Sequence, residues 1–169
     1  MKYFNGFSLR GEEELFSDFV SREDFTLVGF SYGAQLAFEE AYRSRKRVEK
    51  LILLSPAFFQ TEKKSFVRLQ LRFFEQDKDA YIHQFLANVA YPSEIDPTGY
   101  LDAGSSAELE ALLTYRWEER KIIELLERGT QIEVYLGGRD KIIKSDDAFE
   151  FFSTLTVTYL IKDAGHLLQ

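Results

Sequence analysis

The stretch Phe25-Thr26-Leu27-Val28-Gly29-Phe30-Ser31-Tyr32-Gly33 decides the fold, because an apolar run ends in a Gly-x-Ser-x-Gly turn and the helical pattern of residues 34–41 follows at once. A strand, a tight turn and a helix in this order are typical of a nucleophile elbow. The turn forces its central residue into a strained conformation, so glycines stand on either side. The serine hydroxyl is then exposed above a sheet edge, at a helix N-terminus. We interpret Ser31 as a candidate nucleophile; the alternative is a structural turn serine.

A serine nucleophile needs a base, and the chain has two histidines, His83 and His166. His166 follows the run 156–161, which we expect to be the last strand, so it would lie on the loop at that strand's carboxyl end. His83 lies in a helical pattern away from any predicted strand end, and we interpret it as structural or lid-facing. A surface position near the C-terminus is the alternative for His166.

The orienting acid is sought at another strand end. Asp140 follows the apolar run 131–136 and a Gly-Gly-Arg turn. Sites in parallel sheets lie outside the carboxyl ends of the strands, so Ser31, Asp140 and His166 can converge although they are far apart in sequence. Two alternatives stay open: Asp140 as a turn former, and Asp146 or Asp147 as the acid.

Strand and helix patterns alternate along both ends of the chain. We expect strands at 1–5, 25–30, 50–55, 131–136 and 156–161, and helices at 10–21, 32–44 and 145–153. This alternation predicts an α/β fold, a parallel sheet with helices on both faces. Residues 60–129 contain helical patterns and no convincing strand, so we interpret them as a helical lid inserted between the core segments 1–59 and 130–169.

Composition limits the class of protein. The 169 residues are 45% hydrophobic, enough for one domain with a buried core. The absence of cysteine excludes disulfides, thiolate chemistry and zinc–cysteine sites. Neither a signal peptide nor an apolar run of membrane-spanning length is visible, and we expect a cytoplasmic protein without membrane contact. The net charge of −7 argues against nucleic acid as the main ligand.

Two backbone amides are candidates for an oxyanion hole. One belongs to Tyr32, the residue after the candidate nucleophile. The other belongs to Phe7 in Asn5-Gly6-Phe7-Ser8, the loop that follows the first predicted strand.

Five short motifs together resemble the α/β-hydrolase superfamily: Asn-Gly-Phe at 5–7, Gly-Phe-Ser-Tyr-Gly at 29–33, Leu-Ser-Pro-Ala at 54–57, Gly-Gly-Arg-Asp at 137–140 and Gly-His at 165–166. Within it the chain looks like the short pimeloyl-acyl-carrier-protein methyl ester esterases of bacterial biotin synthesis. This resemblance implies a reduced α/β-hydrolase fold of about five parallel strands, since the chain starts at the family's third strand. The loss would expose a sheet edge.

The same resemblance implies the chemistry and its partner. Ser31 would attack a methyl ester with His166 as base and Asp140 as orienting acid, no metal or organic cofactor is needed, and acyl carrier protein would deliver the substrate. A generic carboxylesterase or thioesterase is the alternative, and a non-catalytic interaction module is a third hypothesis. The oligomeric state is open. Candidates for the acyl pocket, each of which could equally pack in the core, are Phe58, Phe59, Tyr115 and Trp117.

Residues 62–74 are expected to form an amphipathic helix in the lid. Lys64, Arg68 and Arg72 recur at four-residue spacing, with Lys63 beside them, and form a basic stripe. We expect the stripe to dock the acidic carrier protein; a solvated helix face is the alternative. The other face is expected to pack through Phe66, Leu69 and Phe73.

Overall fold

The computed structural model describes residues 1–20 and 23–169. It contains one sheet of five parallel strands, which confirms the expected α/β fold and strand number. The strands lie in the sheet in chain order, so all their carboxyl ends meet at one edge. They are β1 (Lys2–Phe4), β2 (Thr26–Phe30), β3 (Lys50–Leu54), β4 (Gln131–Gly137) and β5 (Val157–Ile161).

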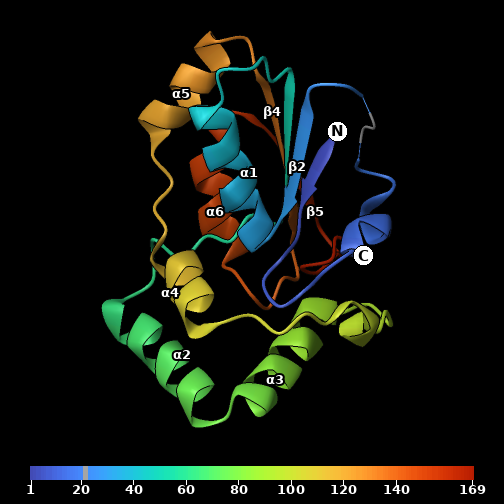
Figure 1. The fold of residues 1–169 in the computed structure, drawn as a ribbon, viewed down its shortest axis with the longest axis vertical. Coiled ribbons are helices and arrows are strands. Elements are labelled where there is room, and N and C mark those ends of the chain that lie inside the picture. The colour runs from blue at the N-terminus through green and yellow to red at the C-terminus, as the bar shows by residue number, and fades with distance from the viewer. Residues whose placement is uncertain (21–22) are drawn as a thin grey trace.

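The helices fall into two groups (Figure 1). Helices α1, α5 and α6 cover one face of the sheet, whereas α2, α3 and α4 lie beyond the carboxyl ends of the strands. The short 3-10 helix η1 lies on the opposite face from α1. The bounds are η1 (Glu12–Phe16), α1 (Tyr32–Arg43), α2 (Lys64–Gln76), α3 (Lys78–Ala90), η2 (Pro97–Tyr100), α4 (Ser106–Thr114), α5 (Glu119–Glu127) and α6 (Ser145–Ser153).

The predicted helix at 10–21 is wrong for the described part of that range, where the structure has only η1. Gly11 precedes η1 in the left-handed conformation, with φ of 77°. Both ends of η1 are then fixed by burial: Glu12 accepts a hydrogen bond from the Gly6 amide, and the Phe16 ring packs on Phe30 at 4.6 Å between centroids. These tertiary contacts override the helical pattern. Residue 21 lies outside the described residues.

The core is built on the central strands. Val28 and Phe30 of β2 are fully buried, and so is the run 51–54 of β3 to within 1%. Strands covered on both faces read as continuous apolar runs, as these do. Small side chains on the inner face of α1, Ala34 and Ala37, let the helix lie close to the sheet. Each large apolar side chain buried here contributes about 1.5–3 kcal/mol.

The segment 60–129, predicted as a lid, runs between β3 and β4 and holds α2, α3, α4 and α5 but no strand of the sheet. One buried side chain ties it to the core: Gln35 of α1 donates hydrogen bonds to the carbonyl oxygens of Ala57 and Leu112, both at 3.0 Å. The division into a core (1–59 and 130–169) and a lid stays a prediction. No helix in the described part of the chain is long and apolar enough to cross a membrane.

Candidate active site

Ser31 occupies a sharp turn between β2 and α1. Its φ of 54° and ψ of −114° lie in a strained region that a non-glycine residue rarely adopts. Its amide donates to the Leu54 carbonyl at 2.9 Å, and its carbonyl accepts from the Ala34 and Ala57 amides, both at 3.1 Å. Anchoring on both sides keeps the strained conformation in place.

The two flanking glycines are required by close backbone approach. A Cβ atom on Gly29 would collide with the carbonyl oxygen of Gly33, and one on Gly33 would collide with the carbonyl oxygen of Phe4 at the end of β1. A side chain at either position would therefore push α1 away from the sheet and move Ser31.

His166 joins the serine to a carboxylate. Its Nε2 lies 2.9 Å from Ser31 Oγ, and its Nδ1 lies 2.6 Å from Asp140 Oδ2. The side chains of His166 and Asp140 are fully buried, and Ser31 is 3% exposed. The second carboxylate oxygen of Asp140 accepts the amides of Ile142 at 2.6 Å and Ile143 at 3.1 Å, which fixes the acid in its turn. The arrangement can move a proton from serine to histidine while the carboxylate holds the ring.

The alternatives to these residues lie elsewhere. Asp146 and Asp147 are in the first turn of α6, where Asp147 accepts a hydrogen bond from Thr61 at 2.7 Å. His83 is an exposed residue of α3. The structure therefore brings together Ser31 and His166 with Asp140 and not with the alternatives, although the catalytic roles stay predictions.

Ser55 supports the site and was not predicted from the sequence. It directly follows β3, and its hydroxyl donates to the backbone carbonyl of His166 at 2.7 Å. This bond fixes the loop that carries the histidine. The available signal was the position of Ser55, one residue past a strand end, in the Leu-Ser-Pro-Ala motif.

The two expected oxyanion-hole residues, Tyr32 and Phe7, lie in the segments that follow the carboxyl ends of β2 and β1. Tyr32 is the first residue of α1, where amides lack a partner within the helix. Phe7 lies in the loop after β1 and is 2% exposed. Within residues 1–20 and 23–169, neither amide donates a hydrogen bond to another backbone group in a turn or loop. Their role stays a prediction.

The buried carboxylate of Glu12 fixes the loop that carries Phe7. Glu12 is 0% exposed, and its Oε1 accepts the Gly6 amide at 2.7 Å and the Tyr3 hydroxyl at 3.3 Å. Its other oxygen is buried without a hydrogen-bond partner. Burial raises the pKa of Glu12 above its ordinary value. Sequence reasoning missed this residue because it lay in a segment expected to be an ordinary helix.

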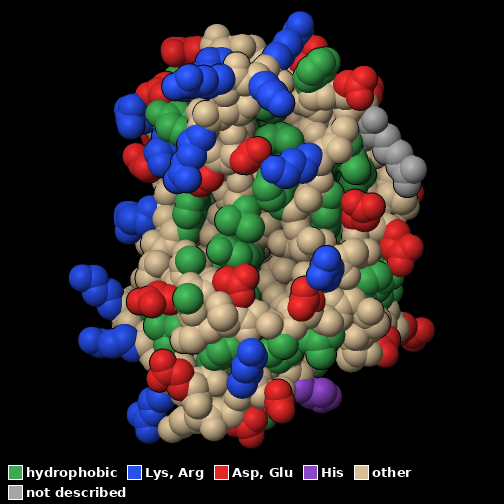
Figure 2. Space-filling model, viewed as in Figure 1, with side chains coloured by type: hydrophobic (Ala, Val, Ile, Leu, Met, Phe, Trp, Pro, Cys, Tyr) green, Lys and Arg blue, Asp and Glu red, His purple; other side chains and the backbone are tan. Residues whose placement is uncertain are grey.

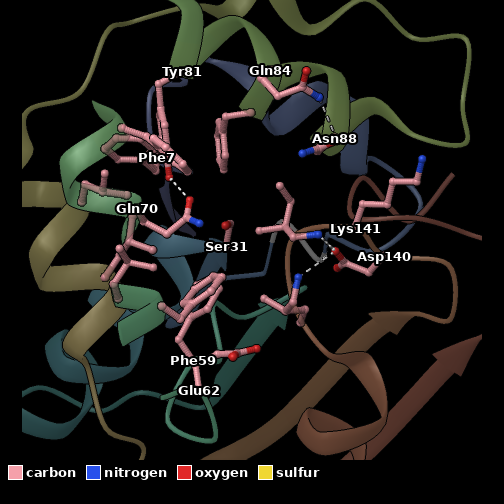
Figure 3. A pocket seen from close by; sticks show the side chains of 18 of the residues that line it. Phe7, Ser31, Phe59, Glu62, Gln70, Tyr81, Gln84, Asn88, Asp140 and Lys141 are labelled. Carbon is pink, nitrogen blue, oxygen red and sulfur yellow. Dashed lines mark hydrogen bonds between the residues drawn. The ribbon is translucent and has the colours of Figure 1, made fainter. Parts of the chain in front are cut away.

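A cavity of about 490 Å³ opens in front of Ser31 (Figure 3). Its volume falls in the range of small-molecule sites. Helices α2, α3 and α4 and the turn after Asp140 enclose it. Most of its wall is aromatic or aliphatic, formed by Phe7, Phe59, Phe66, Phe73, Tyr81, Phe85, Leu109, Leu112, Leu113, Ile142 and Ile143.

Of the four aromatic residues suggested for an acyl pocket, Phe59 lines this cavity and the other three do not. Phe58 packs on Phe151 and Phe152, with ring centroids 5.4 and 6.0 Å apart. Trp117 packs on Phe152 and Phe38, and its indole N–H donates to a backbone carbonyl. Tyr115 hydrogen-bonds to Glu39 of α1 at 2.9 Å. These three belong to the packing among α1, α6 and the inserted segment.

The basic stripe lies on an exposed helix. Lys63, Lys64, Arg68 and Arg72 are all exposed, and basic side chains project from the outer side of the molecule over α2 (Figure 2). The packing face of α2 differs from the prediction: Phe66 is partly buried, but Leu69 and Phe73 are 43% and 47% exposed. Phe74 is the fully packed residue of this helix instead. The expected face was one residue out of register.

No family model matches the chain, and no curated protein matches its sequence. Solved structures do match. The esterase EaEST from Exiguobacterium antarcticum superposes with a TM-score of 0.66 at 18% identity, over 83% of this chain and 59% of that protein. BioG from Haemophilus influenzae has a TM-score of 0.62 at 13% identity, over 98% and 87% of the two chains. MenH from S. aureus gives 0.64 at 14% identity, over 97% and 85%.

The fold is that of the α/β-hydrolases. At these identities the likeness is one of fold, and the chain spans less than two thirds of the length of EaEST but most of BioG and MenH. In the α/β-hydrolase fold the nucleophile, acid and base follow one another along the chain as Ser, Asp/Glu and His. Ser31, Asp140 and His166 occur in that order and at the carboxyl ends of β2, β4 and β5. Within the described residues, no cluster of three or more potential ligands is arranged to hold a metal ion.

Proposed function

We propose that this chain is a serine carboxylic-ester hydrolase that cleaves the methyl ester of pimeloyl-acyl carrier protein and releases methanol. One observation carries the proposal: the buried hydrogen-bonded row of Ser31, His166 and Asp140 opens onto an apolar cavity. The motifs that resemble the pimeloyl-acyl-carrier-protein methyl ester esterases support the substrate, and the fold shared with the esterase EaEST agrees with ester hydrolysis.

The reaction follows from the geometry. His166 Nε2 takes the proton of Ser31 as Oγ attacks the ester carbonyl carbon, and Asp140 stabilises the imidazolium through Nδ1. The amides of Tyr32 and Phe7 hold the developing oxyanion, each lowering the barrier by roughly 3 kcal/mol. The imidazolium then protonates the departing methoxide, leaving an acyl-enzyme. His166 activates a water molecule that hydrolyses the acyl-enzyme and regenerates Ser31.

The partner in this proposal is an acidic acyl carrier protein in the cytoplasm. Helix α2 contributes the inner side chains Phe66 and Phe73 to the cavity and presents a basic outer side. Lys64, Arg68 and Arg72 make no salt bridge with any described residue, so their charges are available to a partner. Opposite charge near the cavity entrance would steer the carrier so that its arm reaches Ser31.

A small-molecule carboxylesterase is the second candidate. It is favoured by the fold shared with the esterase EaEST and by the absence of any need for a docking surface in the chemistry. Both candidates use the same serine and differ in whether a carrier is required.

The test is a substrate panel with product identification by mass spectrometry. The purified protein is incubated with carrier-bound and free acyl methyl esters, with Ser31→Ala as the matched control. We expect demethylation that Ser31→Ala abolishes, with kcat/KM highest for the carrier-bound pimeloyl ester. Equal rates on free esters would favour the carboxylesterase, and turnover undiminished in Ser31→Ala would overturn the serine mechanism.

A further inference from the structure

Polar side chains interrupt the apolar wall of the cavity at several points, and one hydrogen-bonded pair among them joins α2 to α3. Gln70 of α2 and Tyr81 of α3 both line it, and the Tyr81 hydroxyl donates to Gln70 Oε1 at 2.9 Å. Figure 3 shows the Gln70 carboxamide and the Ser31 hydroxyl directed into the same cavity. Neither Gln70 nor Tyr81 has a part in the chemistry described above.

Tyr81 sets the orientation of the carboxamide. Its ring packs edge-on against Phe74, with centroids 5.4 Å apart and planes at 79°, which holds the hydroxyl in place. Burial raises the pKa of Tyr81 to about 12, so the hydroxyl keeps its proton at neutral pH and stays a donor. Since the Gln70 oxygen accepts this proton, the carboxamide turns its NH₂ group away from Tyr81.

The NH₂ group then needs an acceptor. Within the described residues, Gln70 Nε2 donates no hydrogen bond to the protein. The aromatic side chains that line the same cavity, such as Phe66, Phe73 and Phe85, offer no acceptor either. A polar group that loses water without gaining a partner costs free energy. A bound molecule is therefore favoured if it brings an oxygen to this point.

We propose that Gln70, oriented by Tyr81, binds a carbonyl oxygen on the acyl chain, so that the cavity selects acyl chains with a second carbonyl over plain fatty acyl chains. This inference rests on the proposed function and specifies its substrate class. When Ser31 attacks the ester at one end of a seven-carbon dicarboxylate, the chain carries its second carbonyl into the cavity. A fatty acyl chain of the same length leaves the Gln70 donors unpaired. Gln70 is thus a specificity residue, and Tyr81 is a positioning residue.

The test compares two methyl esters of equal acyl length, dimethyl pimelate and methyl heptanoate, by the rate of methanol release. We expect the unmodified protein to prefer the diester about tenfold in kcat/KM, the scale of one buried neutral hydrogen bond. Gln70→Leu and Gln70→Glu should both remove this preference through KM for the diester, with a smaller change in KM for methyl heptanoate. Gln70→Glu keeps the shape and the bond from Tyr81, so its effect reports the lost donors rather than misfolding.

Two further variants complete the experiment. Tyr81→Phe should weaken the preference only in part, because the carboxamide remains but is no longer oriented. Gln76→Leu, on an exposed residue of the same helix, should behave as the unmodified protein. Equal losses on both esters, or an intact preference in Gln70→Glu, would overturn the role of Gln70 while leaving the esterase in place. No methanol release above the Ser31→Ala background from either ester or from the carrier-bound pimeloyl methyl ester would overturn the proposed function itself.

Discussion

The loops at the carboxyl end of the sheet and the helix pair α2–α3 face each other across the cavity, and they are held in different ways. Helix α1, which begins directly after Ser31, buries six residues, whereas α2 buries only Phe74. The loops that carry Ser31, Asp140 and His166 are fixed by hydrogen bonds to neighbouring strands and turns. The groups assigned to bond-making thus sit on the rigid part of the molecule, and those assigned to substrate choice sit on the more lightly packed part.

The two histidines test this division most strongly, because one lies on each side. His166→Ala should lower kcat by several orders of magnitude, since it removes the proposed base from a fully buried hydrogen-bonded row. His83→Ala, on the exposed side of α3, should change kcat less than twofold. Steady-state kinetics on one small nitrophenyl ester measures both. A loss of kcat in His83→Ala as large as that expected for His166→Ala would place the base on the helix pair and contradict the division described above.

The basic stripe offers a test of intermediate size on the helix side alone. Arg68→Glu with Arg72→Glu should raise KM for a carrier-bound ester about tenfold and flatten its salt dependence, because the attraction to an acidic partner is reversed. On a small nitrophenyl ester kcat/KM should stay within twofold. The control, Arg45→Glu with Lys46→Glu, makes the same charge change on exposed residues beyond the C-terminal end of α1, the end away from Ser31. Equal effects of the two pairs would leave net charge as the explanation and remove the docking role.

The smallest expected effect is on the sheet side and concerns the stability cost of burying the Glu12 carboxylate. The pKa of Glu12 is raised in the folded state, so its contribution to stability is complete below the ordinary glutamate pKa and is lost as the pH rises through the folded value. Glu12→Gln keeps an acceptor for the Gly6 amide and removes the charge. Thermal unfolding between pH 4 and 8 should therefore show Tm of the variant gaining on the unmodified protein by a few degrees as the pH rises. A gap independent of pH would mean that the carboxylate carries no such penalty.

The features that could be predicted from the sequence are those that depend on the pattern of neighbouring residues. The strand-turn-helix around Ser31 and the strand ends before Asp140 and His166 specify where backbone geometry must place these residues. The five-strand parallel sheet followed from the same apolar runs, since each is long enough to be a strand and too short to be a helix.

Tertiary contacts decided what the sequence did not show. Trp117 and Phe59 are both aromatic residues near the inserted segment, yet one packs against Phe38 and the other lines the cavity. Helical periodicity placed Phe73 on a packing face, but the position of α2 over the cavity left it half exposed. Glu12 lies in the range predicted as a helix at 10–21, and helical periodicity does not show its buried hydrogen bond with the Gly6 amide.

Helices α2 to α5 lie between two paired strands, and this position affects how their lengths and sequences can change in evolution. Strands β3 and β4 pair in register from Lys50 and Gln131, so the whole inserted segment is a single loop whose two ends are fixed side by side. The entropy lost on closing such a loop grows slowly, by about 0.6 kcal/mol for each doubling of its length. Helices α2 and α3, which lie beyond the sheet, can therefore be lengthened or shortened at little cost in loop-closure entropy, while the strand ends below remain in place. The substrate range of such a chain can diversify faster than its chemistry.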